Sequence, residues 1–266
     1  MTPEQTLARL ESFLEPFPSA AVAFSGGVDS TLVLAIANRA ISGRVLAITG
    51  ISPSVAPSEA TEARRTAERI GAELVFADTH EMDNPLYVAN SGDRCYHCKS
   101  ELYDVCHRMA EAEDLAVVLD GANADDTGDH RPGMVAAHEK GVVSPLLECG
   151  VGKREIRDLA RQLGLPTWDK PALACLSSRL PVGTEVTMER LRAVDTVEQH
   201  LRSLGFEQVR ARHLGEKVRI EVEPELIADL HREAESGNLA ELVTAAGFRT
   251  YEIDPRGYRQ GSLNLL

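Results

Sequence analysis

The sequence predicts an α/β fold in which helices cover both faces of a parallel sheet, followed by a smaller α+β domain. Two observations carry the first part of this prediction. Apolar strand patterns alternate with helical patterns through the first two thirds of the chain, and each strand pattern is a continuous apolar run. Continuous apolar runs are typical of strands buried on both faces, and such strands occur in parallel sheets between two layers of helices.

The elements follow in order along the chain. We expect strands at 20–24, 45–49, 73–77 and 116–119, with helices at 30–40, 57–70 and 95–111. The order changes near 180–183, which predicts a first domain at 1–180 and a second at 181–266. The second domain is expected to contain helices at 188–204, 224–234 and 239–246 and strands at 208–213, 217–222 and 249–253.

Composition narrows the class of protein. The 266 residues carry a net charge of −13, with 43% hydrophobic and 26% charged residues, which is ordinary for a soluble globular protein. No stretch has the length of a membrane span, and residues 1–16 form a charged helical pattern rather than a secretory signal. We therefore expect a cytoplasmic protein without membrane contact. The acidic charge argues against broad nucleic-acid binding, although a local basic patch at 210–219 and 256–259 remains.

Three polar or glycine-bearing loops follow strands of the predicted sheet. They are the segments at 25–30, at 49–53 with Gly50, and at 120–126 with Gly121, Asp125 and Asp126. Ligands of parallel sheets bind at the carboxyl ends of the strands. The sequence therefore predicts a ligand site where these three loops converge.

The first of these loops has the composition of an anion site. It reads Ser25-Gly26-Gly27-Val28-Asp29-Ser30, between an apolar strand and a helical pattern. Glycines let the backbone approach phosphate oxygens, and the amides and dipole of a helix start supply positive potential. We expect Ser30 or Asp29 to cap the helix. The lysine of a Walker-type P-loop is absent.

Five cysteines in a chain expected to be cytoplasmic favour free thiols, metal binding or catalysis over disulfides. Cys95 and Cys98 lie three residues apart at the start of a helical pattern, so they share a face that suits metal ligands, a redox pair or burial. Cys175 lies in an unpatterned loop with Ser178 and Arg179, and it is a candidate third thiolate. Cys106 and Cys149 are the other candidates for such a role. We expect Cys106 to be packed in the protein interior, and we assign no role to Cys149.

The glycine loop matches the SGGxDS signature of the ATP pyrophosphatases, the PP-loop superfamily with an adenine nucleotide alpha hydrolase-like fold. Together with DGANADD at 120–126, DHRPG at 129–133, ACLSSR at 174–179 and GYRQG at 257–261, it resembles the LarE family over nearly the whole chain. That family is the pyridinium-3,5-biscarboxylic acid mononucleotide sulfurtransferases of nickel-pincer nucleotide biosynthesis, the cofactor of lactate racemase.

The resemblance implies that ATP adenylates a pyridinium carboxylate, after which sulfur replaces oxygen. The glycine loop would hold the pyrophosphate, with Mg²⁺ on Asp29, Asp125 or Asp126 unless these are turn formers or caps. Arg179 would orient phosphate or a substrate carboxylate. The resemblance also implies hexamers, with a substrate-phosphate site lined by Arg210, Arg212 and Arg259. The alternative for these arginines is pairing with Glu207, Glu221 or Glu223.

Two sources of sulfur remain open. Some LarE relatives donate the sulfur of the cysteine that matches Cys175, which leaves dehydroalanine. Others resemble tRNA thiolases, in which three cysteines hold a [4Fe-4S] cluster with an open iron that carries sulfide from a donor. Cys95, Cys98 and Cys175 favour the second route. The other functions are a tRNA thiolase, an ATP-dependent amide ligase, and an AMP sensor without catalysis.

Overall fold

The computed structural model describes residues 2–128, 132–171 and 174–259. Residues 129–131 and 260–261, which are parts of two of the motifs, lie outside the described residues, as do residues 172–173. The chain divides into two compact units, each described by itself. The larger unit is Met1–Tyr87 with Asp93–Leu173, and the smaller unit is Val88–Gly92 with Ala174–Leu266. The predicted boundary, after residue 180, lies within the smaller unit of this division.

The sheet of the larger unit has four parallel strands in the order β3-β2-β1-β4. They are β1 (Ala20–Ala23), β2 (Val45–Ile51), β3 (Glu73–Asp78) and β4 (Val118–Leu119). The chain moves from β1 outward to β3 and then returns to the other side of β1, so the switch point of the sheet lies between β1 and β4. Open α/β sheets bind ligands at such a point.

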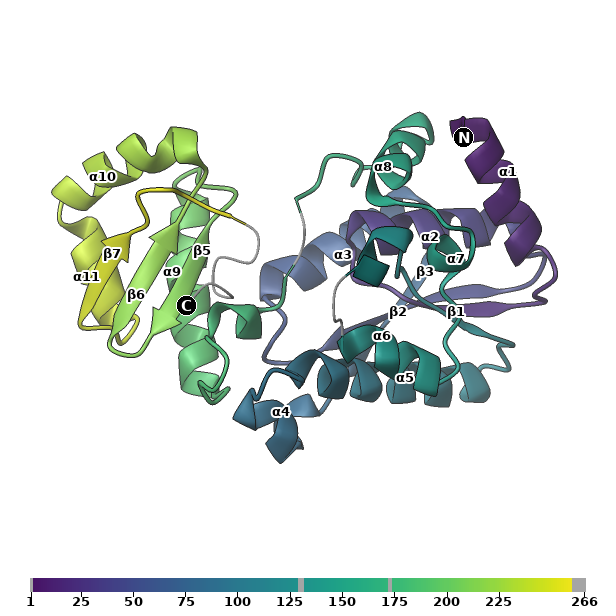
Figure 1. The fold of residues 1–266 in the computed structure, drawn as a ribbon, viewed down its shortest axis with the longest axis horizontal. Coiled ribbons are helices and arrows are strands. Elements are labelled where there is room, and N and C mark those ends of the chain that lie inside the picture. Colours follow the sequence, from purple (N-terminus) through teal and green to yellow (C-terminus); the bar gives the residue numbers. More distant parts are fainter. Residues whose placement is uncertain (1, 129–131, 172–173, 260–266) are drawn as a thin grey trace. The chain divides into compact units, whose positions relative to one another are not determined.

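Helices cover both faces of this sheet, as predicted (Figure 1). Ala20 and Val22 of β1 pack into the hydrophobic core on one face, and the alternate residues Ala21 and Ala23 pack into the core on the other. The first core takes residues from α1 (Pro3–Leu14), α2 (Val28–Ala40), α3 (Pro57–Arg69), α7 (Pro145–Glu148) and α8 (Lys153–Gln162). The second takes residues from α5 (Arg94–Ala112) and α6 (Pro132–Glu139). Burial on both sides explains why the strands have continuous apolar runs.

The smaller unit is an α+β fold, as predicted. Its sheet has the order β5-β6-β7, antiparallel between β5 and β6 and parallel between β6 and β7. The elements are α9 (Met188–Ser203), β5 (Arg210–Leu214), β6 (Lys217–Glu221), α10 (Ile227–Glu235), α11 (Asn238–Ala245) and β7 (Thr250–Ile253). Short 3-10 turns lie at Glu81–Asp83, Ala124–Gly128, Leu176–Arg179 and Pro224–Leu226.

Several expected boundaries shift. The strand expected at 116–119 is paired only at Val118–Leu119, and the helix expected at 224–234 becomes a 3-10 turn followed by α10. The helices α4 (Pro85–Ala89), α6, α7 and α8 were not predicted. Of these, α8 contacts the glycine loop through its first residue, Lys153.

Candidate active site

The turn after β1 requires glycine at one position. Gly26 has a φ of +71°, and a Cβ atom on it would lie 3.0 Å from the Cα of Ala63. The hydroxyl oxygens of Ser25 and Ser30 lie 3.1 Å apart, and the amide of Gly27 donates to Ser25 Oγ at 3.3 Å. The turn is therefore held by its own serines.

The start of α2 differs from the expectation. The helix begins at Val28 rather than Ser30, its N-cap is Gly27, and no side chain accepts a hydrogen bond at the cap. The prediction that Ser30 or Asp29 caps the helix is wrong. The Ser30 hydroxyl instead donates to the Gly27 carbonyl at 3.3 Å, and the Asp29 carboxylate accepts from Lys153. A helix start without a side-chain cap is an arrangement that favours a bound anion.

The loop after β4 packs directly against this turn, as the predicted convergence requires. A Cβ atom on Gly121 would lie 2.8 Å from the amide nitrogen of Ser30, so the close approach depends on glycine. The buried carboxylate of Asp120 fixes the loop by accepting from Tyr103 at 2.6 Å and Ser144 at 2.7 Å. Gly50 was expected in the loop after the second strand, but the strand extends further and Gly50 lies within β2, where a Cβ atom would meet side chains 3.0 Å away.

The two aspartates of the DGANADD motif have structural partners. Asp125 accepts from the backbone amide of Lys153 at 2.6 Å and so holds the first residue of α8, while Asp126 accepts from the amide of Asn123 at 3.0 Å. These bonds match the turn-former and cap alternative for both residues. Within the parts of the chain that the structure describes, no group of three or more His, Cys, Asp or Glu side chains is arranged to hold a metal ion.

The side chains of two lysines that the sequence analysis did not single out contact the glycine loop. Lys153 Nζ contacts the carboxylate of Asp29 at 2.5 and 2.6 Å, and Lys170 Nζ donates to the carbonyl of Gly26 at 3.0 Å. Burial lowers the pKa of Lys170. Arg157 of α8 holds the segment by donating to the carbonyls of Trp168 and Lys170 at 2.8 Å each. Both lysines are more than a hundred residues from the loop in sequence, so no local pattern predicts their position.

In the smaller unit, Cys175 opens a short 3-10 turn and its side chain is partly exposed. The amide of Ser178 donates to the Cys175 carbonyl at 2.9 Å. Arg179 donates to the carbonyls of Ala174 at 2.5 Å and Cys175 at 3.0 Å, and to Ser178 Oγ at 3.1 Å. These hydrogen bonds therefore fix the backbone of the loop that carries the Cys175 thiol.

The position of Arg179 corrects the expectation that it orients phosphate or substrate. Its side chain is 1% exposed and forms a bidentate pair with the buried carboxylate of Glu198, at 2.7 and 2.8 Å. Glu198 also accepts from Arg202 at 2.7 Å and from the amide of Ala211 at 2.9 Å. Burial raises the pKa of Glu198, but the hydrogen bonds and charge of Arg179, together with the Ala211 amide and the charge of Arg202, hold this pKa below its ordinary value. Arg179 thus positions the Cys175 loop.

The arginines of the expected phosphate site also have partners within the protein. Arg212 pairs with Glu221 at 2.9 Å, which is one of the alternatives that the sequence left open, and it donates to the Ser178 carbonyl at 3.2 Å. Arg210 is 7% exposed and lies over the ring of Tyr258 at 5.2 Å, and burial lowers its pKa.

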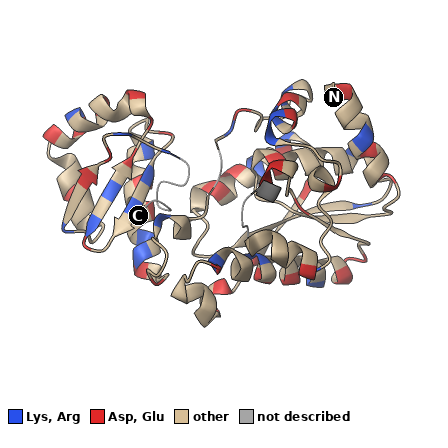
Figure 2. Cartoon of the chain, in the orientation of Figure 1, with Lys and Arg blue, Asp and Glu red and all other residues tan. Residues whose placement is uncertain are grey.

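Arg259 pairs with Asp254 at 3.3 Å and is partly exposed. Tyr258 precedes Arg259 in the chain. The contact of its ring with Arg210 places this part of the GYRQG motif beside β5. Figure 2 shows the blue basic segments on β5 and β6 of this unit. A phosphate role for the three arginines stays a prediction.

The remaining cysteines separate by burial. Cys95 is exposed and Cys98 is partly buried in the first turns of α5, whereas Cys106 is fully buried and Cys149 is 6% exposed. Burial raises the pKa of Cys106 to about 12, which confirms the expectation that it is packed. Cys95 and Cys98 belong to the larger unit and Cys175 to the smaller one.

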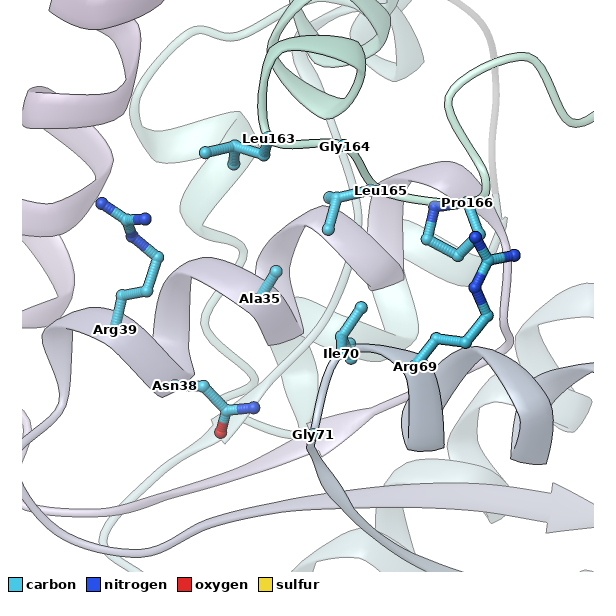
Figure 3. Close-up of a pocket in the computed structure, with 10 residues that line it drawn as sticks. All are labelled: Ala35, Asn38, Arg39, Arg69, Ile70, Gly71, Leu163, Gly164, Leu165 and Pro166. Atoms are coloured by element: carbon cyan, nitrogen blue, oxygen red, sulfur yellow. The ribbon is translucent and has the colours of Figure 1, made fainter.

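A separate hollow of about 630 Å³ lies at the other end of α2 from the loop (Figure 3). Asn38, Arg69 and Leu163 are among the residues that line it. None of the predicted site residues lines this hollow. It lies at the carboxyl ends of the three helices α2, α3 and α8, and Arg39 and Arg69 contribute to its lining.

Comparison with known proteins identifies the class and then the family. The glycine turn, the parallel sheet and a match of residues 15–129 to the asparagine synthase family model define a PP-loop ATP pyrophosphatase domain. The chain is 34% identical over 97% of its length to pyridinium-3,5-bisthiocarboxylic acid mononucleotide synthase of Lactiplantibacillus plantarum, of which it covers 93%. The chain belongs to the LarE family, as the motifs predicted.

Two further relatives frame this result. The chain is 44% identical over 98% of its length to an uncharacterized protein of Synechocystis, of which it covers 97%. It is 28% identical over 55% of its length to one component of the glutamine-hydrolyzing GMP synthase of Methanopyrus kandleri, covering 50% of it.

Across the described part of the chain, no helix combines the length and the apolar character that crossing a membrane requires.

Proposed function

We propose that this protein is an ATP-dependent sulfurtransferase that converts carboxylates of pyridinium-3,5-biscarboxylic acid mononucleotide into thiocarboxylates, in nickel-pincer nucleotide biosynthesis. The observation that carries the proposal is the full-length similarity to a synthase whose named product is a bisthiocarboxylic acid mononucleotide. The geometry supports the proposal in two respects. The larger unit has a turn suited to phosphate, and the smaller unit has a partly exposed thiol on a loop held by hydrogen bonds.

The first step activates the carboxylate. A carboxylate oxygen of the substrate attacks the α-phosphorus of ATP, the bond between the α-phosphorus and the bridging oxygen breaks, and pyrophosphate leaves with the electron pair. The product is an acyl-adenylate, whose AMP is a far better leaving group than oxide. The uncapped amides at the start of α2 and the lysines on the loop would stabilise the charge that develops on pyrophosphate. In this proposal Asp29 would hold Mg²⁺, which would neutralise phosphate charge.

The second step replaces oxygen by sulfur. A sulfur nucleophile attacks the acyl carbon and AMP leaves with the electron pair. If the nucleophile is Cys175 Sγ, a thioester forms. Loss of the Cα proton to a base then breaks the Cβ–Sγ bond, which releases the thiocarboxylate and leaves dehydroalanine. Pairing of Glu198 with Arg179 would hold the Cys175 carbonyl while the thiol reacts.

A [4Fe-4S] cluster is the alternative sulfur source that we favour. Thiolates are the ligands of such clusters, and Cys95 and Cys98, neither of which is in a disulfide, lie on the first turns of α5. Cys175 would be the third ligand. When bound, the cluster would supply sulfide from its open iron, and Cys175 would remain intact.

The function is tested by pyrophosphate release. We expect the protein to release pyrophosphate from Mg²⁺-ATP when the pyridinium biscarboxylate mononucleotide is present, and not when tRNA or ammonia replaces it. Release with tRNA would favour a tRNA thiolase, and release with ammonia an amide ligase. If ATP binds but no pyrophosphate forms with any of the three, the proposed reaction is excluded.

Cluster binding gives a separate prediction. After anaerobic reconstitution we expect about four iron atoms per chain in the wild type, from the stoichiometry of the cluster. Cys95→Ala should lower the iron content to background. Cys149→Ala, which removes a buried cysteine of the same unit, is the matched control and should retain the iron. Full iron content in Cys95→Ala would remove this cysteine from the ligand set.

A further inference from the structure

The glycine loop lacks the lysine that contacts phosphate in Walker-type loops, and the structure places Lys153 where such a cation is needed. Lys153 is the first residue of α8, and its ammonium group meets Asp29 in the first turn of α2. This is the helix start on which no side chain forms a cap. The ammonium group therefore lies beside the first turn of α2.

The backbone beneath Lys153 is fixed from two sides. Asp125 accepts from the Lys153 amide at 2.6 Å, and Glu155 accepts from the Gly152 amide at 3.3 Å. The carboxylate of Asp125 packs against Gly152, where a Cβ atom would lie 3.1 Å away. The loop after β4 thus fixes the backbone of Lys153 at the start of α8. The side chain of Lys153 can still exchange one partner for another.

The ammonium group has capacity for a second acceptor. It carries three N–H donors, and Asp29 is its sole acceptor among the residues that the structure describes. The side chain is 40% exposed and that of Asp29 is 25% exposed, so both remain open to solvent at the loop. A phosphate oxygen on the helix start can therefore reach the ammonium group without unfolding any element.

We propose that Lys153 is a ligand of the polyphosphate chain of the nucleotide, supplied by α8 in place of the missing Walker lysine. Without nucleotide its charge is neutralised by Asp29, and with nucleotide it donates to phosphate oxygen. The proposal rests on the ATP use in the proposed function, but not on the identity of the carboxylate substrate. The competing explanation is that Lys153 only neutralises Asp29.

Binding of Mg²⁺-α,β-methylene-ATP, measured by calorimetry, tests the proposal without any turnover. We expect Lys153→Met to weaken binding by about tenfold to a hundredfold, the range for a hydrogen bond to a charged group. Lys153→Arg should recover part of the affinity. The matched control is Lys140→Met, because Lys140 makes a similar pair with Asp104 at 2.6 Å in the same unit. Trp168 fluorescence reports whether the variants keep the fold near α8.

A double-mutant cycle separates the two explanations. If Lys153 binds phosphate, Lys153→Met should weaken binding by a similar factor in the Asp29→Asn background, where no carboxylate needs neutralising. Loss of the effect in that background, or wild-type affinity in Lys153→Met itself, overturns the proposal. A protein that binds the analogue in this Lys153-dependent way but releases no pyrophosphate with the pyridinium substrate would contradict only the proposed function.

Discussion

Replacing Cys175 by serine is expected to abolish sulfur transfer while substrate-dependent pyrophosphate release continues. In the proposed reaction, adenylation depends on the turn after β1 and its helix start in the larger unit, whereas the thiol belongs to the smaller unit. Both sulfur sources need this thiol, either as the donor or as a ligand of the cluster. Thiocarboxylate is measured by mass spectrometry of the product, and pyrophosphate by a coupled assay.

The mass of the wild-type chain after turnover separates the two sources. Loss of one H₂S from the peptide that contains Cys175 indicates the sacrificial route, because dehydroalanine remains. An unchanged mass with more than one thiocarboxylate per chain indicates the cluster. Cys149→Ser is the control for removal of a thiol and should transfer sulfur normally. Undiminished transfer by Cys175→Ser would contradict both routes.

Glu198→Gln should destabilise the protein by about 3–5 kcal/mol, the usual cost of removing one partner of a buried ion pair. Glu198 has no exposed surface and accepts from Arg179, Arg202 and the Ala211 amide. A neutral amide leaves Arg179 buried without its counter-charge, and this arginine holds the carbonyls of the Cys175 loop. The free energy of unfolding from urea titration measures the effect.

Glu252→Gln provides the matched control. Glu252 also pairs with two cations of the same unit, Lys217 and Arg219, both at 2.5 Å, but its side chain is 34% exposed. Surface pairs contribute at most about 1 kcal/mol, so this variant should be close to the wild type. Equal losses in the two variants would show that burial of the Glu198 pair does not determine its contribution.

The effect of Glu198→Gln should also depend on pH. The pKa of Glu198 in the folded protein lies below 4.5, so its ionised form stabilises the fold above the pKa of the unfolded chain. This stabilisation is lost as the pH falls through the lower, folded-state pKa. The difference between wild type and variant should therefore be complete near pH 7 and shrink below about pH 4.5. A difference that stays constant down to about pH 3 would contradict the ion-pair explanation.

Local patterns were sufficient for most of the fold. Apolar runs predicted all four parallel strands; β1, β4 and most of β2 are buried on two faces, whereas β3 at the edge of the sheet is only partly buried. Helix ends were less predictable. Ser30 reads as a cap in sequence, yet its hydroxyl bonds back into the turn and Gly27 takes the cap position.

The site was predictable only in part, because some of its contacts join residues that are far apart in the chain. The sequence by itself determined the glycine turn and the packed Cys106, because each depends on residues close together in the chain, and it determined the family through motifs that are each local. Tertiary structure alone decided that Arg179 faces Glu198 rather than solvent, that Arg212 pairs with Glu221, and that Lys153 reaches Asp29. Charged side chains choose their partners by distance in space, and the folded backbone, not sequence spacing, sets that distance.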